Sequence, residues 1–159
     1  IEHCLPQAVT SEKERLNYRN MVAVCWGNRD AHSNEDKSCD AKRGSLKDIQ
    51  QSMKKINVFD GTTLSDIKYS SDGTIYSNDK DLDEDLNLRL NLNCEARRLK
   101  ECRVQALHAL YRSIAQKYFG KTAPQSYYQK LMEHYTAQQE MKTPYSGILI
   151  YWLNKHIRQ

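Results

Sequence analysis

Long apolar runs are missing from this sequence. The longest one, Gly147–Leu153, is seven residues long, whereas a membrane-spanning helix needs roughly 18–20. A secretory signal peptide is missing as well, because no charged start is followed by an apolar segment. These absences exclude a helical membrane protein and favour a chain that works in the cytoplasm.

A disulfide framework is missing too. The five cysteines are odd in number and irregularly spaced, whereas secreted disulfide-rich domains usually show an even count in a shorter chain. This usage also favours a reducing cytoplasm. The five are Cys4, Cys25, Cys39, Cys94 and Cys102.

Two ligand-binding sequence patterns are absent. The chain has no nucleotide-binding loop of the Gly-x-x-x-x-Gly-Lys-Ser/Thr type, so any dependence on ATP has to come from a partner. The acidic segment Asp79–Asp85 lacks the glycine and the glutamate of an EF-hand calcium loop. It is predicted instead to be a loop and a first helical turn, where carboxylates interact favourably with the helix dipole.

What the sequence does contain is polar and slightly basic. Only 39% of its 159 residues are apolar, the mean hydropathy is -0.82, and the net charge is +4. A basic cluster at 97–103 is either a solvated helix face or a surface that contacts phosphates. The chain opens on Ile1-Glu2-His3, a pattern typical of the middle of a strand, and we therefore expect a further N-terminal portion.

The spacing of apolar residues predicts strand, loop, strand, polar loop and helix over residues 1–60. The second strand is Val22–Val24, and the helix begins near Asp40, a good N-cap. Residues 64–78 are predicted to form a β-hairpin, because alternating apolar residues flank Asp72-Gly73. The buried face of the helix is predicted to carry Leu46, Ile49, Met53 and Ile56.

The rest of the chain is predicted to be helical. One apolar stripe runs from Leu99 to Ile114 and stops before Gly120, a second helix begins near Ser126, and Thr143-Pro144 opens a third. These helices carry more aromatic residues than their own core needs, so the aromatics either pack together or form an interface. They are Tyr127, Tyr128, Tyr135, Tyr145, Tyr151 and Trp152.

Three segments of the first 45 residues, taken in order, resemble the HNH nuclease motif. They are Ile1-Glu-His-Cys-Leu-Pro6, Asn17-Tyr-Arg-Asn-Met-Val-Ala-Val-Cys25 and Ser38-Cys-Asp-Ala-Lys-Arg-Gly44. The departure from the family is Asp40, where many members carry His or Asn. A carboxylate at that position is a ligand that Mg²⁺ prefers.

A narrower resemblance covers most of the chain. The same signatures occur together with a Tyr-x-x-Asp-Gly-x-Ile hairpin, Tyr69–Ile75, and a Leu-Asn-Leu-Asn segment, Leu90–Asn93. The whole set resembles the PtuB family, the HNH effectors of Septu and retron-associated anti-phage systems. This resemblance implies an ABC/SMC-like ATPase partner of the PtuA type, a nucleic-acid substrate (DNA or RNA), and a retron RNA/DNA hybrid as a further component of the complex.

The resemblance implies roles for particular residues. His3 is the candidate general base, and Asn20 fixes the loop that orients it. Glu2 and Asp40 are the candidate ligands of a catalytic Mg²⁺ or Mn²⁺ ion.

Two further pairs have alternative interpretations. Lys42 and Arg43 either contact phosphate or carry solvated helix charge. Cys25 and Cys39 are either buried free thiols or half of a structural zinc site. The other half would come from a Cys-x-x-Cys knuckle that the family carries before the first motif, in residues absent from this chain.

Together these observations predict an α+β fold. A ββα-metal core of the HNH, or His-Me finger, type is expected over residues 1–60, a β-hairpin and acidic connector over 61–95, and a helical, partner-binding extension over 96–159. The expected function is that of a metal-dependent HNH endonuclease that works with an ATPase in anti-phage defence. The alternatives are a catalytically inactive zinc-knuckle-like binding module and a basic helical nucleic-acid-binding subunit.

Overall fold

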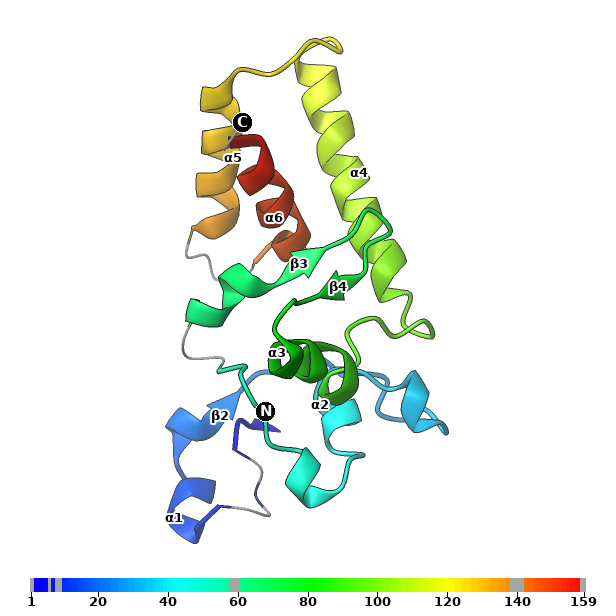
Figure 1. Cartoon of the computed structure of the whole chain (residues 1–159), viewed down its shortest axis with the longest axis vertical. Helices are drawn as coiled ribbons and strands as arrows, with labels where there is room; N and C mark the ends of the chain where they lie inside the picture. The colour runs from blue at the N-terminus through cyan, green and yellow to red at the C-terminus, as the bar shows by residue number, and fades with distance from the viewer. Residues whose placement is uncertain (1, 6, 8–9, 58–60, 138–141, 158–159) are drawn as a thin grey trace. The chain divides into compact units, whose positions relative to one another are not determined.

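The computed structural model describes residues 2–5, 7, 10–57, 61–137 and 142–157 (Figure 1). Ile1 and Pro6, which belong to the first motif, lie outside these residues. The chain divides into two compact units. The first unit comprises Ile1–Lys68 and Ile75–Leu99, and the second comprises Tyr69–Thr74 and Lys100–Gln159.

The first unit begins with two short antiparallel strands. β1 (Glu2–His3) pairs with β2 (Met21–Val22), with Glu2 opposite Val22 and His3 opposite Met21. β2 is shorter than the predicted strand and begins one residue earlier. The helix α2 (Cys39–Arg43) follows these two strands in the chain, which gives the order strand, strand, helix. A metal core built on these three elements stays a prediction. The remaining short helices are α1 (Glu12–Arg15), η2 (Tyr18–Asn20), η3 (Asn34–Asp36), α2 (Cys39–Arg43), η4 (Asp48–Gln50) and η5 (Gly61–Asp66).

The long helix predicted from Asp40 is wrong. α2 ends at Arg43, where Gly44 takes the C-cap position, and Ile49 is 84% exposed instead of buried. The backbone N–H groups of Lys54, Lys55 and Ile56 do not continue a helical ladder, because they donate to the carboxylate of Asp85. The apolar residues spaced by three and four therefore do not lie on one helix. Their segment is held instead by the side chain of Asp85, which is distant in the sequence.

The acidic segment forms the helix start that its composition predicts. Asp79 caps α3 (Lys80–Glu84) by accepting from the N–H groups of Asp81 and Leu82 at 3.0 Å each. α3 continues into one π-helical turn, η6 (Asp85–Arg89), which packs beside α2 (Figure 1). Asp85, at the junction, is fully buried.

The predicted hairpin is confirmed. β3 (Lys68–Tyr69) pairs with β4 (Ile75–Tyr76) in a two-stranded sheet. The Asp72 carboxylate organises the turn, since it accepts from the Thr74 N–H at 3.1 Å and from the Thr74 hydroxyl at 2.8 Å. These hydrogen bonds, above all that of the Thr74 hydroxyl, lower the pKa of Asp72.

Gly73 is required by this turn. Its φ is +82°, and a Cβ atom there would collide with the backbone carbonyl of Lys100. We expect Gly73→Ala to lower the free energy of unfolding by about 2–4 kcal/mol, from a left-handed backbone and an overpacked contact together. Thermal denaturation followed by circular dichroism measures this loss.

Gly120 provides the matched control in the same unit. Its φ is +76°, but a Cβ atom there has no neighbour within 4 Å. Gly120→Ala should therefore cost only the backbone part, about 1 kcal/mol. Equal losses in the two variants would contradict the collision at Gly73.

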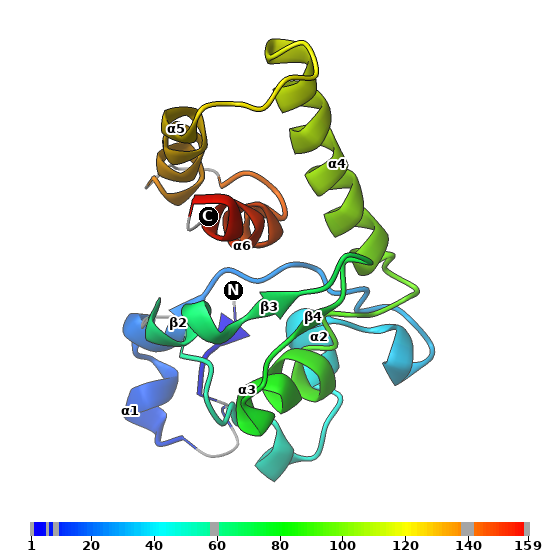
Figure 2. The same ribbon diagram turned by 45° about the horizontal axis from the view of Figure 1, so that its top comes forward.

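The second unit has the three helices that the sequence predicts. They are α4 (Leu99–Lys117), α5 (Gln125–Thr136) and α6 (Ser146–Ile157), and α5 and α6 lie side by side (Figures 1 and 2). Their core consists of Leu107, Leu110, Ile114, Ala123, Ile148 and Leu149. Of the helices in the described ranges, none has both the length and the apolarity that crossing a bilayer requires.

Most of the surplus aromatic residues pack onto this core. The ring of Trp152 lies 5.0 Å from that of Tyr111 and 5.9 Å from that of Tyr128, measured between centroids. Tyr127 and Tyr135 are also partly buried against the core. Mutual packing therefore accounts for these residues, whereas Tyr145 is 40% exposed.

Candidate functional site

Glu2 and Asp40 converge on one positive charge. Arg29 places its Nη2 atom 2.6 Å from Glu2 Oε1 and 3.7 Å from Asp40 Oδ2. Glu2 lies on β1, Asp40 lies in the first turn of α2, and Arg29 follows Gly27 and Asn28, which both have positive φ. The hydrogen bond to Glu2 is the main cause that raises the pKa of the Arg29 guanidinium.

Arg43 fixes the orientation of Asp40. Its Nε and Nη2 atoms lie 3.1 and 2.7 Å from Asp40 Oδ1, and both side chains are largely buried. The same guanidinium donates to the carbonyl oxygens of His3 at 2.5 Å and Cys4 at 2.9 Å. Arg43 thus ties α2 to the end of β1 and leaves Asp40 Oδ2 directed to Arg29.

The two predicted phosphate contacts are engaged inside the protein. All three nitrogens of the Arg43 guanidinium have the partners just described. Lys42 is buried, and its Nζ atom lies 2.9 Å from Glu35 Oε1. Positioning of α2 is the role that these contacts give to both residues.

The ring of His3 is held in one tautomer. Nε2 lies 2.8 Å from the carbonyl oxygen of Arg15, and Nδ1 lies 3.0 Å from Gln7 Nε2. Because a carbonyl only accepts, Nε2 carries the proton, and the lone pair is on Nδ1, which accepts from the Gln7 amide. Nδ1 is therefore the atom that can take a proton from water.

Asn20 clamps the segment that follows β1. It is buried, and its Oδ1 atom accepts from the Leu5 N–H at 2.8 Å. Its Nδ2 atom donates to the carbonyl of Glu14 at 3.4 Å. These bonds connect the strand that carries His3 with the end of α1, where the Arg15 carbonyl oxygen accepts the hydrogen bond from His3 Nε2.

The structure brings some of the sequence-predicted residues together and separates others. Glu2 and Asp40 share Arg29, while the His3 ring bonds to Gln7 and Arg15. Neighbouring residues on a strand project to opposite faces, which accounts for the separation of Glu2 and His3. Over the described part of the chain, no three His, Cys, Asp or Glu side chains form a group that could hold a metal ion.

Two carboxylates still fit a magnesium site of the substrate-assisted kind. Mg²⁺ is usually bound by one or two carboxylates, with waters and substrate phosphates as its other ligands. The Arg29 guanidinium already stands where a cation between Glu2 and Asp40 would be. Glu2 and Asp40 are therefore the residues that would hold the ion, and the ion itself stays a prediction.

Cys25 and Cys39 form a second small cluster. Their Sγ atoms are 2.8 Å apart, brought together where the Ser38 N–H donates to the Gly27 carbonyl. Burial, assisted by the hydrogen bond to Cys25, raises the pKa of Cys39 to about 12. Two thiols supply half of a tetrahedral zinc site, and the zinc itself stays a prediction.

A cavity of about 640 Å³ lies in the first unit beside these groups. Asn20, Cys25, Cys39, Asp40 and Arg43 line one part of it. Its lining also includes residues 52–57, a segment in which three backbone N–H groups bind Asp85.

Sequence reasoning missed Arg29 and Asp85. Arg29 is 27 residues from Glu2 in the chain, and no spacing rule connects the two. Asp85 was one carboxylate in an acidic run, and only its burial distinguishes it. The dipeptide Gly27-Asn28 indicates a turn, but it does not indicate that the side chain of Arg29 reaches back to Glu2 on β1.

Comparison of the chain with protein-family models, with curated proteins and with solved structures finds no match.

Proposed function

We propose that this chain is a metal-dependent endonuclease of the HNH type, which hydrolyses phosphodiester bonds of nucleic acids. The observation that supports the proposal is that Glu2, on β1, and Asp40 both approach one guanidinium nitrogen of Arg29. A carboxylate pair of this kind suits a hard divalent ion that also binds phosphate.

The residues of the chain divide the chemistry between them. In this proposal the Gln7 amide gives way, and the His3 ring, which lies on the opposite face of β1 from Glu2, turns toward the ion so that Nδ1 accepts a proton from the attacking water. Asn20 and Arg43 hold the backbone around His3. Glu2 and Asp40 would hold Mg²⁺ or Mn²⁺, which neutralises the scissile phosphate and stabilises the leaving oxygen when bound.

The partners follow from the same resemblance. From the resemblance to the PtuB family we infer that the nuclease works in the cytoplasm with an ABC/SMC-like ATPase of the PtuA type. The sequence given has no nucleotide-binding loop, so any dependence on ATP comes from that partner. The nucleic-acid substrate, DNA or RNA, is met in this complex, and a retron RNA/DNA hybrid is its further component. In the second unit, Phe119 and Tyr145 are exposed aromatic residues and therefore candidates for a partner contact.

A non-catalytic zinc-knuckle-like module is the second candidate, supported by the Cys25–Cys39 pair. The third alternative, a basic nucleic-acid-binding subunit, loses support at Arg103. This member of the basic cluster is buried and donates to the Gly73 carbonyl at 2.8 Å.

The test is a cleavage assay on plasmid DNA and total RNA in Mg²⁺, with the full chain alone and with its ATPase. Asp40→Ala removes the carboxylate and with it one ligand and one negative charge, so the Mg²⁺ concentration at half-maximal rate should rise at least about tenfold. Excess Mg²⁺ or Mn²⁺ should restore part of the rate.

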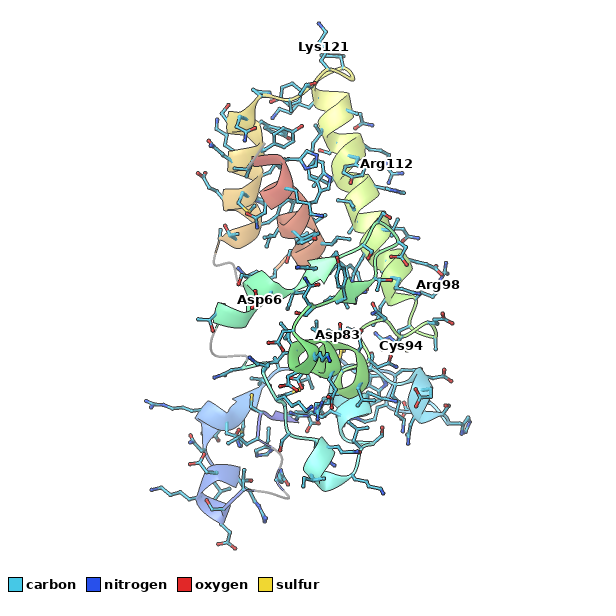
Figure 3. The ribbon with its side chains drawn as sticks, viewed as in Figure 1. Asp66, Asp83, Cys94, Arg98, Arg112 and Lys121 are labelled. Atoms are coloured by element: carbon cyan, nitrogen blue, oxygen red, sulfur yellow. The ribbon has the colours of Figure 1, made fainter. Side chains whose placement is uncertain are left out.

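Asp66→Ala is the matched control, because Asp66 is an exposed carboxylate of the same unit (Figure 3). Its Mg²⁺ dependence should equal that of the wild type. If Asp40→Ala also leaves the Mg²⁺ dependence unchanged, the ligand is another residue, and the exposed loop residue His32 is the next to test. Stoichiometric zinc without any cleavage would favour the knuckle module instead.

A further inference from the structure

Arg29 stands between the two carboxylates that the proposed nuclease needs for its cation. The guanidinium is 47% exposed, whereas the Asp40 side chain is 13% exposed. Two carboxylates that both approach one nitrogen atom repel each other unless a positive charge lies between them. Arg29 supplies that charge from within the chain.

Arg29 is bound closely by Glu2, at 2.6 Å, and only loosely by Asp40. A half-exposed ion pair contributes little because water screens it and the long side chain loses rotamer freedom. The contact with Asp40 Oδ2 is 3.7 Å, longer than a hydrogen bond, and Asp40 Oδ1 is already bound by Arg43. A divalent ion interacts with the same two carboxylates through twice the charge, so it can replace the guanidinium.

Once it is displaced from Glu2 and Asp40, the Arg29 guanidinium can bind a phosphate. Arginine binds phosphate through two parallel N–H···O bonds, and the ion that replaces it at Glu2 and Asp40 holds a phosphate oxygen. The side chain would therefore turn from the carboxylates to the phosphate next to them.

We propose that Arg29 is a displaceable counter-ion, which holds Glu2 and Asp40 together until a divalent cation enters and then binds the phosphate of the nucleic acid. The assignment rests on the proposed function, since the cation and the phosphate are its cofactor and its substrate. Arg29 thereby couples the arrival of the metal to the arrival of the substrate.

Trp26 gives this exchange an optical signal. Its ring is 61% exposed, and the Arg29 Cζ atom lies 5.6 Å from the ring centroid. Departure of a cation from the face of an indole changes its surroundings and hence its fluorescence emission. Trp26→Phe should abolish the signal without changing the Mg²⁺ affinity.

The experiment titrates the full chain with MgCl₂ at constant ionic strength, by tryptophan emission and by calorimetry. The wild type should bind Mg²⁺ with a change in emission. Arg29→Gln should bind Mg²⁺ about three- to tenfold more tightly, because the competing charge is gone. Arg112→Gln, an outward-facing arginine on α4, should match the wild type (Figure 3).

A second arm measures the contact with phosphate. At saturating Mg²⁺, Arg29→Gln should raise KM for an oligonucleotide about tenfold while kcat changes less than about threefold, and Arg29→Lys should recover part of the loss. Unchanged KM would overturn the phosphate contact.

Equal Mg²⁺ affinities of the wild type and Arg29→Gln, including no measurable binding by either, would overturn the counter-ion whether or not the protein cleaves. Failure of the proposed function gives a different result from failure of the counter-ion. Tighter Mg²⁺ binding by Arg29→Gln in a protein that cleaves no nucleic acid would overturn the proposed function and the phosphate contact, and would leave the counter-ion in place.

Discussion

Asp85→Asn is expected to destabilise the first unit by about 3–5 kcal/mol, the cost of breaking a buried ion pair and its hydrogen bonds on one side. The carboxylate is fully buried and accepts from the N–H groups of Lys54, Lys55 and Ile56 at 2.7–3.0 Å. Asparagine has only one acceptor oxygen, and its NH₂ group, which can only donate, would face the backbone N–H groups that also donate. Chemical denaturation followed by circular dichroism measures the loss.

The surroundings of Asp85 make the loss hard to relieve. Arg89 is buried beside it, with its Nε atom 3.5 Å from Asp85 Oδ1 and 2.8 Å from the Ser52 carbonyl. Without the carboxylate, the guanidinium keeps only Glu84 as a charged partner, at 2.7 Å. Each buried donor that loses its acceptor costs about 1–3 kcal/mol.

Asp81→Asn is the matched control. Asp81 lies on α3 and also binds Lys54, but through the Lys54 side chain and not through its backbone N–H. The Lys54 Nζ–Asp81 Oδ1 pair is 3.0 Å long but about half-exposed and screened by water, so its loss should cost much less than the loss of the Asp85 carboxylate. A cost at Asp85 no larger than that at Asp81 would show that Asp85 does not hold residues 52–57.

This interaction also marks where sequence-based prediction succeeded and failed. The hairpin at Asp72-Gly73 and the helices α4, α5 and α6 were predicted because their signals are local: a turn dipeptide, apolar stripes and stop residues. The helix over Leu46–Ile56 was wrong because the partner of its N–H groups is Asp85, 29 to 31 residues away.

The candidate site shows the same contrast between features that the sequence predicts and contacts that it does not. Glu2 and Asp40 were chosen from motif order, and the structure brings them to one cation. The contacts of the His3 ring with Gln7 and Arg15 could not be predicted, since they depend on how the chain turns back after β1. Likewise Arg43 has the charge of a phosphate-binding residue, and only its three-dimensional contacts identify it as an anchor.

His3→Ala should lower the cleavage rate by about 10²–10⁴-fold, the usual contribution of a general base. The fold should survive, because His3 is at the end of a two-residue strand and its ring bonds to Gln7 and to the Arg15 carbonyl at a partly exposed position. Single-turnover cleavage at saturating Mg²⁺ separates this loss from any change in metal binding.

Two further variants make the His3 test specific. Gln7→Ala removes the donor to Nδ1 without touching the Nε2–Arg15 bond, so it should leave the rate equal to or higher than that of the wild type. His108→Ala, at an exposed position on α4, should change nothing. A rate for His3→Ala within about twofold of wild type would remove His3 from the mechanism, because a lost general base costs far more than that. If Gln7→Ala proves as slow as His3→Ala, the Gln7 contact belongs to the active arrangement, and Nδ1 is not the atom that takes the proton.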